Sequence, residues 1–384
     1  MTPVIQGKVR RNDEDAIGCG DGNTYYRVVL TVPARTSPAS AATSRDVAKA
    51  ANVSQALVSR AFSGNGRIAP ETRDRILKVA AEIGWRPNAL AASMVTGDAP
   101  LVSVITTRLS FDWRAQVLSH LLKAFEAWHL QPLLFYAESD REVDRLLAET
   151  ISWRTRGVVV TAGVVPEARA EAILSRGQFL AALNRPGNHP EAFSIATDNP
   201  IGGRQAATVL LGEGRGRFLA LAGPEDSWAS SRRVDGFVDG LGQAGHQPMV
   251  WHNATMTTEA GLACADRLLA LPPNERPDGV FSTNDAIALG FIDGLRGSGM
   301  TIPQDLSIIG FDNLPASSWT PYQLTSFEQP LDAMVLGVLD HIHAHQQPEA
   351  AQPPSAPEAH RLGADGVIYC APRLVLRQTT RGQL

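Results

Sequence analysis

Polar and basic side chains recur at helical spacing between residues 54 and 62, and their types suit contact with DNA. In a helix that begins after Ser54, one side is apolar and carries Val58, Ala61 and Phe62. The opposite side carries Gln55, Ala56, Ser59 and Arg60. Glutamine can pair with adenine, arginine with guanine, alanine can touch a thymine methyl group, and a serine hydroxyl can bind a phosphate. The pattern therefore predicts a helix that reads bases in the major groove.

Two neighbouring helices are expected to hold this reading helix in place. Thr43 and Asp46 predict a capping box at the start of the first, and Asn52 ends it. The third runs from Pro70 to about Ile83. The apolar sides of these two helices carry Val47, Ala48 and Ala51, and Ile76, Leu77, Val79, Ala80 and Ile83. Three short helices with a tight turn predict a helix-turn-helix head.

The sequence of this segment resembles that of the lac repressor family of bacterial transcription regulators. The resemblance rests on Asp46-Val47-Ala48, Val53-Ser54, Val58-Ser59-Arg60, Thr72-Arg73 and Pro87-Asn88 followed by Leu90-Ala91. It continues to about Thr379 and leaves only the first forty or so residues uncovered. Such a resemblance implies a DNA-binding head, a hinge helix and a two-lobed body that binds an effector.

The resemblance implies a hinge helix at residues 88–97, and a plain linker is the alternative. Met94 stands where the family usually has a leucine that inserts between bases in the minor groove. Leu57 replaces the family's usual threonine, which would bind a phosphate, and Arg67 could reach the DNA backbone in its place. The residues expected to contact DNA are Thr43, Ser54, Gln55, Ala56, Ser59, Arg60, Arg67, Asn88, Ala91 and Met94.

From Leu101 onward, apolar strands alternate with amphipathic helices, which predicts parallel sheets with crossover helices. Expected strands cover 101–106, 132–136, 157–161, 179–183, 217–222, 247–251, 279–282, 306–311 and 373–377, and expected helices include 116–129 and 141–151. The fold class is thus α/β, with a three-helix head, a hinge helix and a body of two periplasmic-binding-protein-like lobes. We expect a leader over residues 1–42, the head over 43–87, the hinge over 88–97 and the body over 98–384.

Polar residues that follow the predicted strands are candidates for binding an effector, because loops at the carboxyl ends of parallel strands converge. Those that match family ligand positions are Asn184, Arg185, Arg233, Asn284 and Asp312, and the aromatic candidates are Phe111, Trp113 and Trp228. Asn184 stands where the family usually has aspartate. For each residue, a helix cap, a salt bridge or core packing is the alternative. A sugar or sugar derivative is the family's commonest effector, but Asn184 and the loop 107–113 leave a nucleobase or an acidic metabolite open. Arg108 and Arg114 near this loop favour a ligand with negative charge.

Composition is compatible with these expectations. The net charge of the chain is -4. Residues 43–100 contain eight lysines and arginines against five acidic residues, so the head is basic and the rest of the chain is acidic. Cys19, Cys264 and Cys370 form no Cys-x-x-Cys pair, which predicts reduced thiols in a cytoplasmic protein without a zinc site. We expect no signal peptide and no membrane partner. The leader is expected to be a disordered tail, with a weak DNA contact through Lys8, Arg10 and Arg11 as the alternative.

Two other classes of protein fit the sequence less well. Motifs of common hydrolases, nucleotide-binding enzymes and metalloproteases are absent from it, and His341, His343 and His345 do not share a helix face, so an enzyme, a metal site and a cofactor are not expected. A solute-binding protein would share the body but lack the head. The sequence therefore predicts a homodimeric regulator that binds a palindromic operator in double-stranded DNA and responds to a small-molecule effector. The proline- and alanine-rich segment 346–363 is expected to be a flexible insertion.

Overall fold

The computed structural model describes residues 16–18, 24–26, 42–63, 68–87, 100–109, 112–139, 142–346 and 360–382. It contains two compact units, residues 1–88 and 89–384. Several predictions fall outside the described residues: the hinge with Asn88, Ala91 and Met94, the side chains of Arg67 and Phe111, and most of the leader and of the segment 346–363. In the leader, β1 (Ala16–Gly18) pairs antiparallel with β2 (Thr24–Tyr26).

The head consists of α1 (Ser44–Ala50), α2 (Gln55–Ser63) and α3 (Pro70–Glu82). The predicted capping box is present. The Thr43 hydroxyl accepts a hydrogen bond from the Asp46 amide, and the Asp46 carboxylate accepts a 2.8 Å hydrogen bond from the Thr43 amide. Asn52 adopts a φ of 51° in the turn between α1 and α2, a conformation that asparagine tolerates better than most residues. The three-helix prediction is confirmed.

The core of the head is small and consists of Val47, Ala48, Ala51, Val58, Ala61, Ile76 and Ala80. Phe62 and Trp85 close one side of it in an edge-to-face contact with ring centroids 5.1 Å apart. Two residues of the predicted α3 stripe do not belong to this core, because Leu77 and Ile83 are each 36% exposed. Leu77 lies one residue from the buried Ile76, which is about 100° around the helix, and α3 packs on α1 and α2 along a single face.

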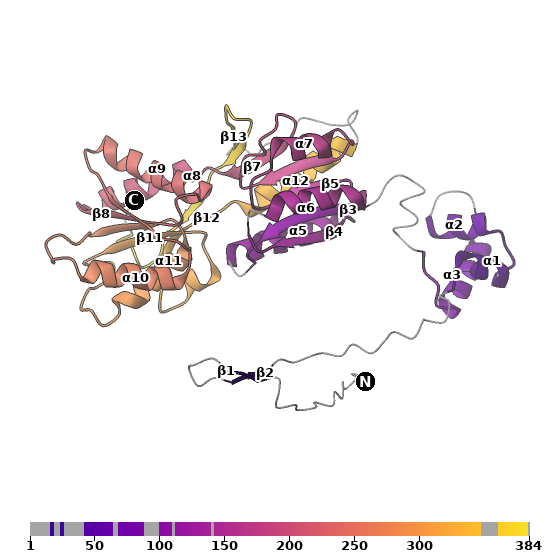
Figure 1. Ribbon diagram of the computed structural model, residues 1–384, viewed down its shortest axis with the longest axis horizontal. Coiled ribbons are helices and arrows are strands. Elements are labelled where there is room, and N and C mark those ends of the chain that lie inside the picture. The colour runs from indigo at the N-terminus through magenta and orange to yellow at the C-terminus, as the bar shows by residue number, and fades with distance from the viewer. Residues whose placement is uncertain are drawn as a thin grey trace. The chain divides into compact units, whose positions relative to one another are not determined.

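The first lobe of the body is a seven-stranded sheet in the order β13-β14-β7-β6-β5-β3-β4 (Figure 1). Its strands are β3 (Leu101–Thr107), β4 (Gln131–Ala137), β5 (Gly157–Val160), β6 (Phe179–Leu183), β7 (Phe193–Thr197), β13 (His360–Leu362) and β14 (Ile368–Cys370). One face packs on α5 (Asp112–Ala127) and α12 (Leu331–Gln346), and the other packs on α6 (Val143–Thr150) and α7 (Glu167–Leu174). A 3-10 turn, η3 (Ile151–Trp153), follows α6.

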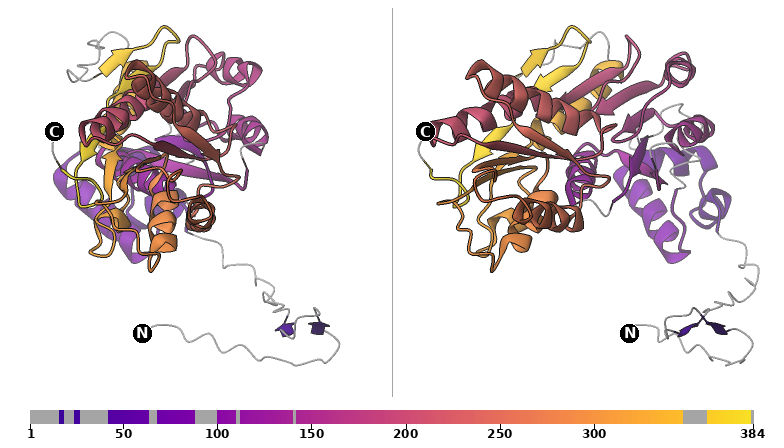
Figure 2. Two further views of the ribbon diagram at one scale, coloured as in Figure 1. Left: turned by 90° about the vertical axis from the view of Figure 1, so that its left-hand side faces the viewer. Right: turned by 60° about the vertical axis from the view of Figure 1, so that its left-hand side comes forward.

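The second lobe is a six-stranded sheet in the order β15-β12-β11-β10-β8-β9. Its strands are β8 (Phe218–Ala222), β9 (Met249–His252), β10 (Gly279–Ser282), β11 (Ser307–Phe311), β12 (Thr325–Glu328) and β15 (Arg373–Val375). The helices α8 (Asn199–Gly212) and α9 (Trp228–Gln243) cover one face, and α10 (Thr258–Leu269) and α11 (Asp285–Leu295) cover the other (Figure 2). The short η4 (Pro315–Ser318) lies between β11 and β12.

The chain passes between the lobes three times: from β7 to α8, from β12 to α12 and from β14 to β15. These passages bring Asp198, Gln329 and Pro372 to the border between the sheets. In both lobes the strands that pair in parallel end toward this border, at residues such as Thr197 and Asp312. None of the helices in the described ranges is long and apolar enough to cross a membrane.

Candidate DNA-binding and effector-binding sites

The outward face of α2 carries the four residues predicted to reach DNA. Gln55, Ala56, Ser59 and Arg60 are all exposed, whereas Val58 and Ala61 on the opposite face are buried. Gln55 donates a 2.8 Å hydrogen bond from Nε2 to the hydroxyl of Ser44, which ties the start of α2 to the start of α1. The helix therefore presents polar side chains on a face that its own core leaves open.

Thr43 and Ser54, two predicted DNA contacts, begin helices in this structure. Thr43 donates from its hydroxyl to Asp46 Oδ2 at 2.7 Å, and this hydrogen bond is the main cause that lowers the pKa of Asp46. Ser54 Oγ accepts from the Leu57 amide at 3.3 Å. Leu57 packs against the core of the head, which accounts for an apolar residue at this position. Both caps orient α1 and α2 and with them the polar face.

The described surface of the head carries more basic than acidic side chains, seven against four. The described cationic side chains of the head are exposed, and they are Arg45, Lys49, Arg60, Arg73, Arg75, Lys78 and Arg86. Such a distribution suits attraction to the phosphate backbone, because phosphate contacts supply much of the affinity of DNA-binding proteins.

In the body, Arg233 and Asp312 form a buried ion pair at the border between the lobes. Arg233, from α9, is 4% exposed, and its Nη1 lies 3.3 Å from Oδ1 of Asp312, the residue that follows β11. The Arg233 Nε donates to Asn199 at 2.8 Å, and its guanidinium carbon lies 3.6 Å from the centroid of the Phe311 ring. Burial lowers the pKa of Arg233, and Asp312 opposes this change. The guanidinium is thus fixed on several sides at once.

Gln329, which no sequence pattern indicated, connects the predicted effector residues. Its Nε2 donates to Asp312 Oδ1 at 2.6 Å, and its Oε1 accepts from the Thr197 hydroxyl at 2.7 Å and from Asn184 Nδ2 at 3.4 Å. The Asn184 Oδ1 in turn accepts from the Thr197 amide at 3.3 Å. The structure therefore brings Asn184, Arg233 and Asp312 into one polar network, which we call the border network, together with Thr197, Asn199 and Gln329. Gln329 directly follows β12, a strand that the sequence did not predict, so no local signal identified this residue.

Asn284 lies beside this network but is committed to helix capping. Its Oδ1 accepts from the Ile287 amide at 3.2 Å at the start of α11, and its Nδ2 donates to the Met256 carbonyl at 3.2 Å. The carbonyl oxygen of the preceding residue, Thr283, accepts a 2.6 Å hydrogen bond from Arg233 Nη1. The backbone around Asn284 therefore reaches the border network even though its side chain does not.

Asp285 is a buried carboxylate close to the same network. It accepts from the Ser326 hydroxyl at 2.6 Å, the Ser317 hydroxyl at 2.7 Å and the Leu314 amide at 2.8 Å. Burial and the neighbouring charge of Asp312 raise its pKa to about 7, against the opposing effect of these donors. Burial also raises the pKa of Asp312, although Arg233 and Gln329 counteract it. Two carboxyls and one guanidinium thus share a buried environment.

The remaining predicted effector residues are more dispersed. Arg185 follows Asn184 and is half-buried. Trp113, in the first turn of α5, packs against the core of the first lobe, and Arg114 donates to the Thr107 hydroxyl at the end of β3. Trp228, at the start of α9, packs against Tyr369 and its neighbours. The packing of the two tryptophans therefore places them in the cores around the border network.

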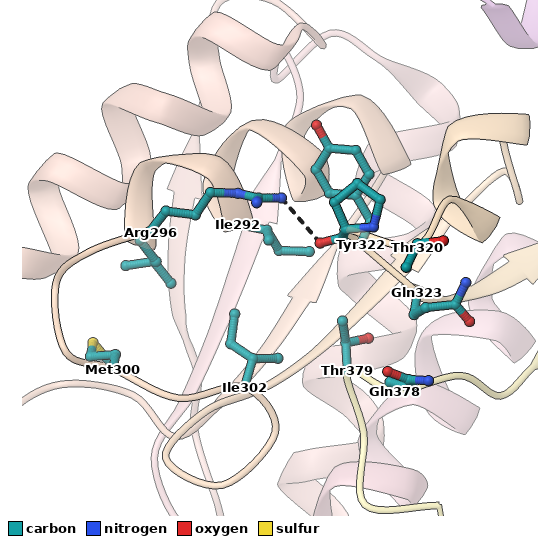
Figure 3. A pocket seen from close by; sticks show the side chains of 11 residues that line it. Ile292, Arg296, Met300, Ile302, Thr320, Tyr322, Gln323, Gln378 and Thr379 are labelled. Atoms are coloured by element: carbon teal, nitrogen blue, oxygen red, sulfur yellow. Dashed lines mark hydrogen bonds between the residues drawn. The ribbon is translucent and has the colours of Figure 1, made fainter.

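A pocket of about 270 Å³ lies in the second lobe, at the opposite end of its sheet from Asp312 (Figure 3). Its walls include Ile292 from α11, Arg296 directly after that helix and the loop residues that precede β11 and β12. Arg296 is already bonded to Asp293 at 2.8 Å and to the Pro321 carbonyl at 3.1 Å. This pocket is therefore separate from the predicted effector residues.

The three histidines of α12 are placed among aromatic and backbone groups. His341 stacks on Phe193 with ring centroids 4.7 Å apart, and burial lowers its pKa to about 4. His345 lies 2.9 Å from the Gly177 carbonyl and His343 meets Trp128 edge to face. In the part of the chain that the structure describes, no group of three or more histidine, cysteine, aspartate or glutamate residues could hold a metal ion.

Two family models match the chain. The model of bacterial regulatory proteins of the lacI family matches residues 43–88, and that of the periplasmic binding protein-like domain matches residues 207–380. Catabolite control protein A of Priestia megaterium is 27% identical over 292 residues, which cover 74% of this chain and 87% of that protein. The HTH-type transcriptional repressor CytR of Escherichia coli is 27% identical over 300 residues, which cover 76% and 85%.

Solved structures share the fold. The lac repressor dimer bound to operator and the anti-inducer ONPF matches with a TM-score of 0.77 and 21% identity, and the match covers 88% of this chain and 99% of that one. The complex of the transcriptional regulator CelR with cellobiose matches with a TM-score of 0.61 and 24% identity over the same shares.

Proposed function

Because the chain belongs to the lacI family of bacterial regulatory proteins, we propose that it is a ligand-responsive transcription regulator that binds operator DNA. We propose a repressor that acts as a homodimer on a palindromic site, with one head on each half-site. A two-fold dimer suits this role because one three-helix head covers few base pairs. The lac repressor structure that matches this chain is a dimer on its operator.

The observation that carries this proposal is the exposed face of α2. Gln55 and Arg60 are types of side chain that read base edges, and they stand on a helix of nine residues whose buried face is anchored by Val58. Ala56 can contact a thymine methyl, and Ser59 a phosphate. We assign the contacts made outside the described residues, by Arg67, Asn88, Ala91 and Met94, to the same DNA surface.

For the body, we propose that a small metabolite binds at the border network. Asn184, Arg233, Asp312 and Gln329 offer amide, guanidinium and carboxylate groups, which together recognise hydroxyl and ring oxygens. A sugar or sugar derivative is the favoured class, and the matching CelR structure is a complex with cellobiose. We place Arg185, Asn284 and the aromatic residues Phe111, Trp113 and Trp228 around this ligand as secondary contacts.

The two sites would be linked through the geometry of the lobes. A ligand that contacts both Asp312 of the second lobe and Asn184 of the first favours one arrangement of the lobes over others. If the hinges of two subunits pair only in one arrangement, ligand binding changes operator affinity by a coupling of about 1–3 kcal/mol. The relatives are transcription regulators, and we propose that this chain likewise has no catalytic role and acts in the cytoplasm.

Paired substitutions test this modular function. We expect Arg60→Ala to abolish selective operator binding, while Arg75→Ala, which removes an equal charge from α3, weakens binding to all DNA sequences to a similar small degree. Arg60→Ala should leave intact the thermal stabilisation of the body by whichever metabolite a screen identifies.

The reverse pattern is expected from Asp312→Asn, which should lose the metabolite's stabilisation and keep operator binding. Asparagine retains the size of the side chain but removes the negative charge from beside Arg233. If either substitution alone eliminated both activities in a folded protein, the modular assignment would be wrong.

A further inference from the structure

A β-hairpin at the edge of the first lobe touches the second lobe. It consists of β13 (His360–Leu362) and β14 (Ile368–Cys370), and Figure 1 shows β13 at the border of the two lobes. β14 joins the sheet by pairing with β7, and β13 pairs only with β14 among the described strands. The hairpin therefore adds two strands to the sheet of the first lobe beyond β7.

An ion pair connects this hairpin to the first helix of the second lobe. Arg361 of β13 donates to Asp198 Oδ2 from Nη2 at 2.9 Å and from Nε at 3.3 Å. Asp198 is 2% exposed at its side chain, and its other oxygen accepts from the Ile201 amide at the start of α8. The Arg361 guanidinium also lies 4.8 Å from the centroid of the Tyr369 ring, its partner across the two strands. Asp198 thus caps α8 and holds the hairpin at once.

An apolar contact adds to the ion pair. Ala196, Val367 and Tyr369 form a small buried cluster in the first lobe, and Trp228 from the start of α9 in the second lobe packs against it. Because Trp228 belongs to the helix that also carries Arg233, the hairpin contacts an element of the border network's own scaffold.

The turn of the hairpin carries a negative charge, Asp365, that is attracted by the positive charge of Arg232 in α9. Tyr369 donates from its hydroxyl to Asp365 at 2.6 Å in the hairpin turn. Burial raises the pKa of Asp365, but the hydrogen bonds from Tyr369 and the Val367 amide, with the positive charge of Arg232 in α9, bring it below its ordinary value. The hairpin is therefore favoured beside α9 by an opposite charge as well as by the packing of Trp228.

We propose that the β13–β14 hairpin is a brace that restrains the movement of the two lobes against each other. The three chain passages alone define a flexible connection, because passages of a few residues can absorb changes in backbone angle. The brace adds two side-chain contacts to these passages, one between Arg361 and Asp198, the cap of α8, and one between the cluster around Tyr369 and Trp228 of α9. The opposite charges of Asp365 and Arg232 add an attraction between the hairpin turn and α9. This restraint goes beyond the proposed function, since it exists without DNA or ligand; any ligand that changes the lobe geometry would have to work against it.

A distance measurement between the lobes tests the brace. Spin labels would be attached to Glu126→Cys in α5 and Gln243→Cys in α9, two exposed positions in different lobes, in full-length protein carrying Cys19→Ser. The two described native cysteines, Cys264 and Cys370, are buried. The distribution of label distances would be recorded without DNA or metabolite. The substitutions are Arg361→Ala and Asp365→Asn, which remove exposed groups and should leave the fold intact.

Arg373→Ala is the matched control. Arg373 forms an exposed ion pair with Glu328, but both residues belong to the sheet of the second lobe. We expect the distance distribution to become clearly broader in Arg361→Ala and Asp365→Asn and to remain unchanged in Arg373→Ala.

Two outcomes would overturn the brace: distributions that stay unchanged in both hairpin variants, or equal broadening in all three variants. Because the measurement requires neither DNA nor metabolite, a failure of the proposed function would not affect its interpretation.

Discussion

The side chain of Gln329 donates a 2.6 Å hydrogen bond to Oδ1 of Asp312, a carboxylate that already faces Arg233. Gln329 stands in the second passage between the lobes, and through Thr197 it also reaches the end of β7, next to the first passage. A residue that links a predicted ligand contact to two chain passages is well placed to transmit ligand binding to lobe geometry.

Replacing Gln329 with leucine should destabilise the body. The substitution keeps the approximate volume but leaves the buried hydroxyl of Thr197 and the carboxylate of Asp312 each without this partner, at a cost of about 1–3 kcal/mol for each group. Urea unfolding, followed by the fluorescence of the tryptophans in the body, measures this change. Gln323→Leu is the control, because Gln323 is more exposed and its side chain bonds to the Ser318 carbonyl. Equal stabilities of the two variants would contradict the role of Gln329.

Replacing Thr43 with alanine should destabilise the head and leave the body unchanged. The substitution removes the two hydrogen bonds of the Thr43 hydroxyl, from the Asp46 amide and to the Asp46 carboxylate, and keeps the bond from the Thr43 amide to Asp46, at a cost of about 1 kcal/mol. Hydrogen exchange of the α1 and α2 amides reports this loss. Thr257→Ala removes the corresponding cap of α10 in the second lobe, and its effect should be confined to that lobe. Faster exchange in the same helices for both variants would show that the two units are not independent.

Replacing Asp285 with asparagine should reduce the pH dependence of the stability of the body. The pKa of Asp285 is about 7 in the folded protein and near 3.8 when unfolded, so between these values only the folded state holds the proton. The stability from this group is therefore fully present below pH of about 4 and is lost as pH rises through 7, with a slope of at most ~1.4 kcal/mol per pH unit. Urea unfolding at several pH values should show a smaller decline for Asp285→Asn. Parallel declines would disprove the assignment.

Replacing Asn184 should separate its backbone role from its side-chain role. Asn184 has a φ of 62°, a conformation that glycine adopts freely and alanine does not. Both Asn184→Gly and Asn184→Ala remove the bonds to Gln329 and to the Thr197 amide, but only alanine adds backbone strain of about 1–2 kcal/mol. Thermal unfolding should therefore rank the alanine variant below the glycine variant. The opposite order would mean that the left-handed backbone is not needed in solution.

Much of the fold could be predicted from the sequence because its signals are local. The caps at Thr43 and Ser54 and the alternation of apolar strands with helices identified the head and the α/β body. The strands β7, β12, β13 and β14 were not predicted, and β13 lies in the segment 346–363 that was expected to be a flexible insertion. Their pairing depends on neighbours that are distant in the chain, as when Ile368 pairs with Ile195.

The candidate body site was predicted only in part. Strand ends pointed to Asn184 and Asp312, and the resemblance pointed to Arg233. The structure joins these residues through Gln329, but no local pattern distinguishes a glutamine that bridges three elements from one on the surface. Trp228 was predicted from its residue type, whereas its packing against Val367 and Tyr369 depends on the hairpin that follows α12. Leu77 was placed in the core by periodicity alone, although its side of α3 faces away from the described core of the head.

The most direct test of the central claim is a selection of bound sequences from a randomised pool of double-stranded DNA, at a stated moderate salt concentration because phosphate contacts dominate raw affinity. Our account predicts enrichment of a palindrome with a flexible central step, and loss of that enrichment with Arg60→Ala. If the full-length protein enriched no motif, alone or with metabolites that stabilise its body, the assignment of a sequence-specific DNA-binding regulator would be contradicted.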